Sequence, residues 1–316
     1  MNIRAPAPLL IAVAGVKGHV IMGYKLSNGV LTVDIADLGE YRGSRFDWTG
    51  FITQVTLERG GHTFCVPESL IPGEGSGGQG LCNEFGISRA IGYDGIKAGD
   101  WFPKPGVGLL QKLNDQPYSF TADYPVQPFA VKREESRHAL GFTSEPLECG
   151  GYSVLFNKTI SLQNDILTIQ YKLENKGKKP IHTEEYMHNF IGINGMTTGP
   201  EFELRLPGNI VIEAPESSYT SELLALSGDR LSWRARPDRP FYCKLGGWEQ
   251  TGETFAWELR HKPSGIGVRE SGDFRIARMA LWGEQHVISP EVFVNISLLP
   301  RQSKHWRRIY RFFSPS

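Results

Sequence analysis

The chain has 316 residues, with 34 Lys and Arg against 34 Asp and Glu, so its formal net charge is zero. Proteins that bind nucleic acid or anionic membranes usually carry a basic excess, because they neutralise phosphate groups. The charge balance therefore argues against both kinds of partner, and a composition of 40% hydrophobic and 22% charged residues excludes a disordered chain.

The composition favours many short strands over helices. The 36 glycines and 20 prolines are spread along the whole chain, and 11% of the residues are aromatic. We therefore expect an all-β protein. No repeat and no low-complexity linker marks a boundary, so we expect a single domain over residues 25–316. The 4 cysteines are scattered without a Cys-x-x-Cys pair, which predicts reduced thiols.

Residues 1–24 are expected to form an N-terminal extension. Its apolar run at 9–16, LLIAVAGV, follows Arg4 and weakly resembles a secretory signal; an extra strand is the alternative. The run is too short to span a membrane, which takes about 20 apolar residues. We expect a cytoplasmic protein, with the periplasm as the alternative location.

Alternation of apolar and polar residues predicts strands along the chain. The predicted strands cover residues 31–36, 51–57, 152–162, 167–173, 202–206, 254–259 and 292–298. Asn164 and Asp165 lie between two of them and predict a hairpin. The best helical candidate is the short segment 221–226. Residues 73–80, GEGSGGQG, lack the Gly-Lys-Ser/Thr ending of a phosphate loop, so we predict a surface loop that is a candidate lid.

Two early segments concentrate polar and aromatic side chains. Residues 41–48 place Arg45 and Asp47 on a tight turn with Phe and Trp. Arg offers a planar fork to oxygen ligands, and aromatic rings offer flat apolar faces, which suits a sugar; the alternative is a local Arg45–Asp47 pair that stabilises the turn. Asn83 and Glu84 follow the glycine-rich loop at a predicted strand entry, where they either line a pocket or form a structural salt link.

The most charged predicted strand covers residues 181–193, IHTEEYMHNFIGI. Alternate residues of a strand share a face, so one side carries His182, Glu184, Tyr186 and His188. This row is either a solvated outer face or the lining of a site. Because it runs into apolar residues, we expect the strand to enter the interior of a sheet.

Glu291 follows Pro290 and begins a strand whose other face is aliphatic. A carboxylate at the mouth of a strand can lie in a cleft with a raised pKa, which is typical of a general base. The alternative is an ordinary glutamate at a surface edge.

Taken in order, these features resemble the aldose 1-epimerases, or galactose mutarotases. Residues 188–193, HNFIGI, are similar to the family's His-Thr-Tyr-Phe-Asn-Leu strand, and residues 289–291, SPE, with the closing 310–312, YRF, are similar to its C-terminal run. The resemblance implies a single-domain antiparallel β-supersandwich. A shifted register of the first match would place Glu185 at the catalytic position instead of His188. The family's Asn-Arg-Ile and His-Gly motifs are absent here, with residues 81–86 in place of the second.

The resemblance implies a small-molecule sugar as the partner, anomer exchange as the reaction, and neither metal nor organic cofactor. Glu291 would act as the base and His188, as imidazolium, as the acid. We predict that the sugar is bound by a set of polar side chains, which are Arg45, Asp47, Asn83, Glu84, Glu184 and Tyr186. The expected assembly is a monomer or homodimer.

Two alternatives stay open at this point. His182, Glu184 and His188 resemble the ligand row of a cupin, which would make the protein a metal-dependent sugar isomerase or lyase. A sugar-binding β-sandwich without catalytic activity is the second alternative, because a fold does not imply a function.

Overall fold

Antiparallel strands make up most of the chain in the computed structural model, which describes residues 23–248 and 255–315. The apolar run at 9–16 lies outside the described residues. Every strand pairing between the described strands is antiparallel, as the resemblance to an antiparallel β-supersandwich implies.

The first sheet has ten strands and carries the candidate site. Its strands, in spatial order, are β1 (Tyr24–Ser27), β2 (Leu31–Ile35), β3 (Ile52–Leu57), β5 (Leu81–Phe85), β13 (Ile181–Asn189), β22 (Val287–Leu298), β21 (Arg278–Glu284), β18 (Phe241–Trp248) and β15 (Gly208–Pro215), with β4 (His62–Thr63) paired to β3.

The second sheet also has ten strands. In spatial order they are β16 (Leu224–Ser227), β17 (Arg230–Trp233), β14 (Phe202–Arg205), β19 (Phe255–His261), β20 (Gly267–Gly272), β23 (Ser303–Phe313), β12 (Ile166–Asn175), β11 (Val154–Gln163), β10 (Ala139–Ser144) and β9 (Val131–Ser136).

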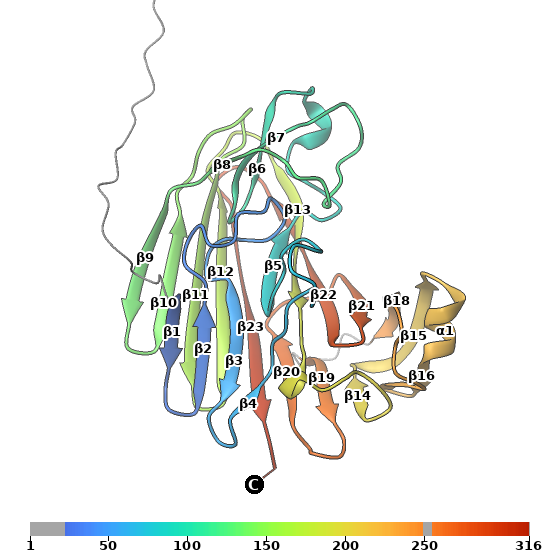
Figure 1. The fold of residues 1–316 in the computed structure, drawn as a ribbon. Helices are drawn as coiled ribbons and strands as arrows, with labels where there is room; N and C mark the ends of the chain where they lie inside the picture. Colours follow the sequence, from blue (N-terminus) through green and yellow to red (C-terminus); the bar gives the residue numbers. More distant parts are fainter. Residues whose placement is uncertain (1–22, 249–254, 316) are drawn as a thin grey trace, which may run out of the picture.

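The remaining elements are short. A three-stranded sheet stands above the first sheet in Figure 1 and consists of β6 (Trp101–Lys104), β7 (Gly108–Gln111) and β8 (Val126–Pro128). The described helices are α1 (Ser218–Leu223) and the 3-10 turns η1 (Tyr93–Gly95) and η2 (Ile193–Gly195). No described helix is both long and apolar enough to cross a membrane.

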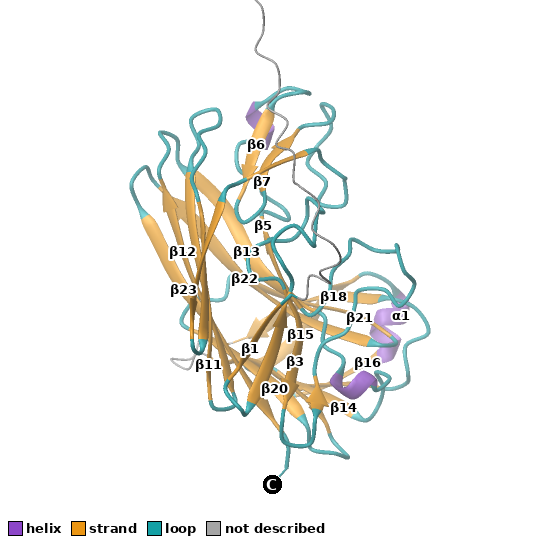
Figure 2. Cartoon of the chain, turned by 60° about the vertical axis from the view of Figure 1, so that its left-hand side comes forward, coloured by secondary structure: helices purple, strands orange, loops and turns teal. Residues whose placement is uncertain are grey.

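The two large sheets pack face to face, and their facing apolar side chains form the main core (Figure 2). Rings from opposite sheets meet there: Phe85 of β5 lies 5.1 Å from Phe156 of β11, centroid to centroid. Burial of such surface stabilises the fold by about 25 cal/mol per Å². The predicted antiparallel β-sandwich is confirmed.

A buried cation joins the two sheets inside this core. Arg308 of β23 forms ion pairs with Glu185 of β13 and Glu270 of β20, and none of the three side chains is exposed. Trp306 donates a further hydrogen bond to Glu185, at 3.0 Å. These contacts satisfy the hydrogen-bonding groups of the Glu185 carboxylate, which lies on the core side of β13.

The predicted local structure is correct in most of its elements. Asn164 has a positive φ of 53° in the turn of the β11–β12 hairpin. The helix prediction at 221–226 is shifted, because residues 224–227 pair with β17 as strand β16 and the helix ends at Leu223. The strand predicted over 181–193 ends its ladder at Asn189, after which η2 turns the chain.

Candidate active site

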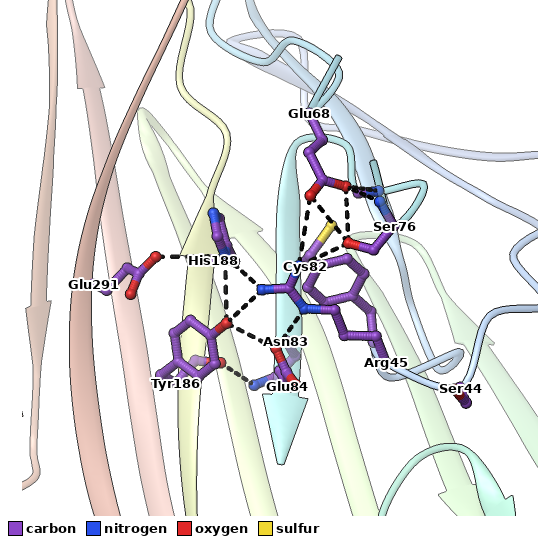
Figure 3. Close-up of polar contacts among 12 residues, drawn as sticks. Ser44, Arg45, Glu68, Ser76, Cys82, Asn83, Glu84, Tyr186, His188 and Glu291 are labelled. Carbon is purple, nitrogen blue, oxygen red and sulfur yellow. Dashed lines mark hydrogen bonds and ion pairs between the residues drawn. The ribbon is translucent and has the colours of Figure 1, made fainter. Parts of the chain in front are cut away.

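Three neighbouring strands of the first sheet place ionisable side chains on one face. In the register of the sheet, Tyr186 of β13 lies opposite Glu84 of β5 and opposite Phe293 of β22. Since side chains alternate along a strand, His188 and Glu291 emerge on this same face, one step further along. Figure 3 shows these groups pointing toward one another from β5, β13 and β22.

His188 and Glu291 form a close buried pair. The distance from Nδ1 of His188 to Oε1 of Glu291 is 3.4 Å, and both residues are 5% exposed. The imidazole stacks on Phe190, with ring centroids 4.2 Å apart, and meets the edge of Trp282. Its Nε2 is buried and has no hydrogen-bond partner among the described residues. Buried polar atoms are nearly always hydrogen-bonded, so an unpaired nitrogen of this kind marks a candidate functional group.

Burial determines which member of the His188–Glu291 pair carries the proton. It lowers the pKa of His188 well below the ordinary 6.5, and the charge of Arg45 lowers it further. It raises the pKa of Glu291 to about 8, because desolvation outweighs the opposing effect of Arg45. At neutral pH the imidazole is therefore neutral and Glu291 is protonated. The raised pKa of Glu291 agrees with the expectation for a carboxylate in a cleft, whereas the neutral imidazole differs from the expected imidazolium, because the sequence alone does not show that His188 is buried.

Arg45 connects the pair to the rest of the face. Its Nη2 lies 3.4 Å from Nδ1 of His188 and donates to the hydroxyl of Tyr186 at 3.2 Å. Its Nε donates to Glu84 at 3.0 Å, and its Nη1 donates to Oγ of Ser76 at 2.7 Å. Because a guanidinium can only donate, Nδ1 of His188 accepts from Arg45, and the neutral ring carries its proton on Nε2.

Glu84 is the anionic centre of the cluster and is fully buried. Besides Arg45, it accepts a hydrogen bond from Tyr186 at 2.7 Å and from Nζ of Lys104 at 3.5 Å. Burial lowers the pKa of Lys104, although Glu84 opposes this shift. The two cations stabilise the Glu84 carboxylate, and Glu84 in turn holds Arg45 and Tyr186 in place.

A hollow of about 440 Å³ opens on the other side of Arg45. It is lined by Tyr41, Gly43, Ser44, Arg45, Glu68, Gly75, Ser76, Phe120, Thr121, Ala122 and Asp123. Arg45 lines the hollow and also touches His188, so its guanidinium lies between the hollow and the acid–base pair. This volume falls within the range of about 300–1,000 Å³ typical of small-molecule sites.

The glycine-rich segment forms one wall of that hollow. Glu68 accepts hydrogen bonds from the backbone of Ser76, at 2.6 Å, and of Gly78, at 3.2 Å, which ties residues 73–80 down over Arg45. The predicted surface loop is therefore beside the site, as the sequence suggested. Its movement as a lid stays a prediction.

Comparison with known proteins identifies the architecture. No protein-family model and no curated protein sequence matches the chain. Among solved structures, it is similar to a protein from Synechocystis sp., with 12% identity and a TM-score of 0.59 over 96% of this chain and 100% of the other. The chain has the galactose mutarotase-like fold.

Two other similar structures carry the mutarotase or aldose epimerase name, which the Synechocystis protein does not. A galactose mutarotase related enzyme from Lactobacillus acidophilus has 13% identity and a TM-score of 0.57, over 93% of this chain and 98% of its own. An aldose epimerase homologue from C. elegans has 11% identity and a TM-score of 0.54, over 92% and 98%. At such low identity the likeness shows the fold alone, so the resemblance to this family is confirmed at the level of the fold.

Within this mutarotase-like fold, five predicted site residues converge. They are Arg45, Glu84, Tyr186, His188 and Glu291. The alternative register that favoured Glu185 does not fit, because Glu185 faces the core and pairs with Arg308. The geometry favours His188 at this place, while the catalytic roles stay a prediction.

Two predicted sugar ligands lie elsewhere, and those predictions are corrected. Asp47 is 1% exposed and pairs with Nζ of Lys158 at 3.1 Å, on the core side of its turn. Asn83 points to the opposite face of β5 from Glu84, because neighbours in a strand alternate, and donates to Glu185 and to the backbone oxygen of Tyr186. Both side chains serve the core of the mutarotase-like fold.

Glu184 shares the face of Tyr186 but lies farther from the pair. It accepts a hydrogen bond from the backbone of Ser88 at 2.9 Å and forms an ion pair with Arg278 at 3.2 Å. It contacts neither His188 nor Glu291 in the described contacts. We therefore place Glu184 at the edge of the site.

The cupin-like metal alternative is wrong for this fold. His182 is exposed and bonds Ser297, Glu184 pairs with Arg278, and His188 faces Glu291, so the three side chains do not converge. Across residues 23–248 and 255–315, no group of three or more His, Cys, Asp or Glu side chains could hold a metal ion. Because a strand rises about 3.3 Å per residue, His182 and His188 of the same strand lie too far apart to bind one metal ion.

Sequence reasoning missed several residues of the site. They are Glu68, Ser76, Lys104, Phe120 and Trp282. Lys104 lies in β6, and no local pattern in the sequence points to Glu84 as its partner. The other four come from loops and from β21, far from Arg45 and His188 in sequence.

Proposed function

We propose that this chain binds an aldose in its ring form and interconverts its two anomers by general acid–base catalysis. The observation that carries the proposal is the buried pair of His188 and Glu291, 3.4 Å apart on adjacent strands, with an unpaired Nε2 on His188 and with Arg45 between the pair and a hollow of about 440 Å³. Anomer exchange needs one group that accepts a proton and one that donates a proton at the same time.

The proton transfers close into a loop that leaves the pair neutral. Glu291 accepts the proton of the C1 hydroxyl and passes its own proton to Nδ1 of His188, whose Nε2 proton moves to the ring oxygen as the C1–O5 bond breaks. The open-chain aldehyde turns about its C1–C2 bond, and the reverse transfers close the ring on either face. No buried ion pair is created, which agrees with the neutral pair that burial favours.

Arg45 has to give up its contact with His188 before a sugar in the hollow can reach the acid–base pair. Its guanidinium lies between the hollow and the pair, so we expect the hydroxyls of the sugar to replace its 3.4 Å contact with His188. The pair distance of 3.4 Å is also long for a hydrogen bond. Catalytic hydrogen bonds are often long before a substrate binds and shorten in the complex.

The proposal is tested by anomer exchange in two variants, Glu291→Gln and His188→Asn. Exchange is followed by NMR magnetisation transfer on a panel of hexoses, pentoses, uronic acids and sugar phosphates. Each proton transfer is worth about a hundred- to ten-thousand-fold in rate, so each variant should lose at least about a hundredfold. His182→Asn is the matched control, because His182 is exposed on the same strand and contacts Ser297. Unchanged rates in both site variants refute the proposal.

A second function is kept as an outcome of the same experiment. The family's Asn-Arg-Ile and His-Gly motifs are missing here, which also fits a sugar-binding β-sandwich without catalysis. Binding of a sugar by the native protein, measured by calorimetry, with no acceleration of anomer exchange over buffer would establish that alternative.

A further inference from the structure

A second hollow, of about 540 Å³, lies next to the first. It is lined by Leu38, Gly39, Arg42, Trp48, Asp123, Tyr124, Pro125 and Val126. The acid–base pair and Arg45 do not border it, so the proposed reaction makes no use of it.

The same two loops border both hollows. From the first loop, Gly43 and Arg45 line the first hollow, while Arg42 and Trp48 line the second. In the second loop, residues 120–122 line the first hollow and residues 124–126 line the second, while Asp123 lines both.

Ser44 joins the two loops at the boundary between the hollows. Its Oγ donates to the backbone oxygen of Ala122 at 3.1 Å and accepts from the backbone nitrogen of Tyr124 at 3.3 Å. The hollows are thus neighbouring compartments, with Asp123 at their common edge. A ligand that filled both would pass over Asp123.

The chemistry of the second hollow suits a sugar ring. Trp48 is half-buried, and its indole is held by a hydrogen bond from Nε1 to the backbone oxygen of Gly43, at 2.8 Å, so its apolar surface is presented without loss of rotamer freedom. A pyranose offers C–H groups on its face and hydroxyls around its edge. The apolar surface matches the first feature.

Polar groups at the rim match the hydroxyls. Nε of Arg42 donates to the backbone oxygen of Gly39 at 2.8 Å, which fixes the exposed guanidinium while its Nη donors have no partner in the described part of the chain. The exposed carboxylate of Asp123 likewise makes no hydrogen bond or ion pair within residues 23–248 and 255–315. One donor group and one acceptor group therefore stand at the edge of an apolar surface.

We propose that the second hollow is a subsite for a second sugar ring, joined to the ring in the first hollow, and that the substrate class is reducing disaccharides or longer oligosaccharides. The reducing-end ring would lie against Arg45, and the next ring against Trp48, with Asp123 between them. The proposal rests on the proposed function for the identity of the first ring. The subsite itself is a claim about affinity for the second ring and does not require anomer exchange.

The test compares dissociation constants of disaccharides and monosaccharides by calorimetry on the full chain. The probes are maltose, cellobiose, lactose and melibiose against glucose and galactose. At least one disaccharide should bind the native protein about tenfold or more tightly than its own reducing-end monosaccharide. In Arg42→Ala and in Leu38→Trp, which fills the hollow from an exposed position, that ratio should fall to about one. Arg239→Ala, an exposed arginine of a distant loop, should keep the native ratio.

The outcomes separate this proposal from the proposed function. Tighter disaccharide binding that both variants abolish, without any anomer exchange, supports the subsite and refutes the epimerase. Anomer exchange with equal affinity for monosaccharides and disaccharides refutes the subsite and leaves the epimerase standing. A disaccharide preference that survives both Arg42→Ala and Leu38→Trp places the second ring elsewhere and also overturns the inference.

Discussion

Replacing Glu291 by Gln should stabilise the folded protein while it removes the activity. The folded environment raises the pKa of Glu291 from its ordinary 4.5 to about 8. The folded chain therefore keeps a proton that the unfolded chain loses between these two pH values. Since stability falls with pH wherever the folded state binds more protons, Glu291 destabilises the native protein increasingly across this window. Below pH 4.5 the carboxyl is protonated in both states and the penalty disappears.

The penalty follows from the size of the pKa shift. Each pH unit in the window changes the free energy of unfolding by about 1.4 kcal/mol. At pH 7, two and a half units above the ordinary pKa, the penalty is about 3 kcal/mol, a large part of the roughly 5–15 kcal/mol that stabilises a typical domain. Gln does not titrate, so the variant lacks the pH-dependent part. Any fixed cost of placing an amide beside His188 is the same at every pH.

The assay is urea unfolding of both proteins at pH 5, 6, 7 and 8. We expect the stability advantage of Glu291→Gln to grow by roughly 3–4 kcal/mol from pH 5 to pH 8. His188 is present in both proteins, so its own titration cancels in the comparison to first order. Glu222→Gln, at an exposed position of helix α1, is the control and should give a constant difference. A constant difference for Glu291→Gln as well would refute a raised pKa at this carboxyl.

Three further results are expected. The value of kcat/KM for anomer exchange, corrected for the uncatalysed reaction, should fall near pH 8, where Glu291 loses its proton. It should also fall on the acid side, below pH 6.5, where His188 gains a proton. Activity confined to pH above 8 would contradict the neutral pair. Lys158→Met should cost about 3–5 kcal/mol in urea unfolding, because it leaves the buried carboxylate of Asp47 with its hydrogen bonds from Thr49 but without its cationic partner. A loss below 1 kcal/mol would show that Asp47 is neutral in the fold. Phe120→Ala should raise KM about tenfold with little change in kcat, since the ring lines the hollow 4.7 Å from the Arg45 guanidinium and away from the acid–base pair; a fall in kcat alone would place Phe120 in the chemical step.

Local patterns in the sequence determined the strands and their faces. Alternation along residues 181–189 was enough to place Tyr186 and His188 on one side and Glu185 on the other, because a strand has a period of two. The same reasoning predicted the hairpin at Asn164, where a positive φ suits Asn. These are short-range properties, and the antiparallel sandwich follows from many of them together.

Only the tertiary structure decided which faces meet. Asp47 and Arg45 are two residues apart in one turn, yet Asp47 pairs with Lys158 in the core while Arg45 reaches Glu84 and His188. No local pattern distinguishes them, because each choice depends on strands that arrive from elsewhere in the chain. The same holds for protonation: the sequence supplied a histidine and a glutamate, but burial by surrounding strands and aromatic rings makes the first neutral and leaves the proton on the second.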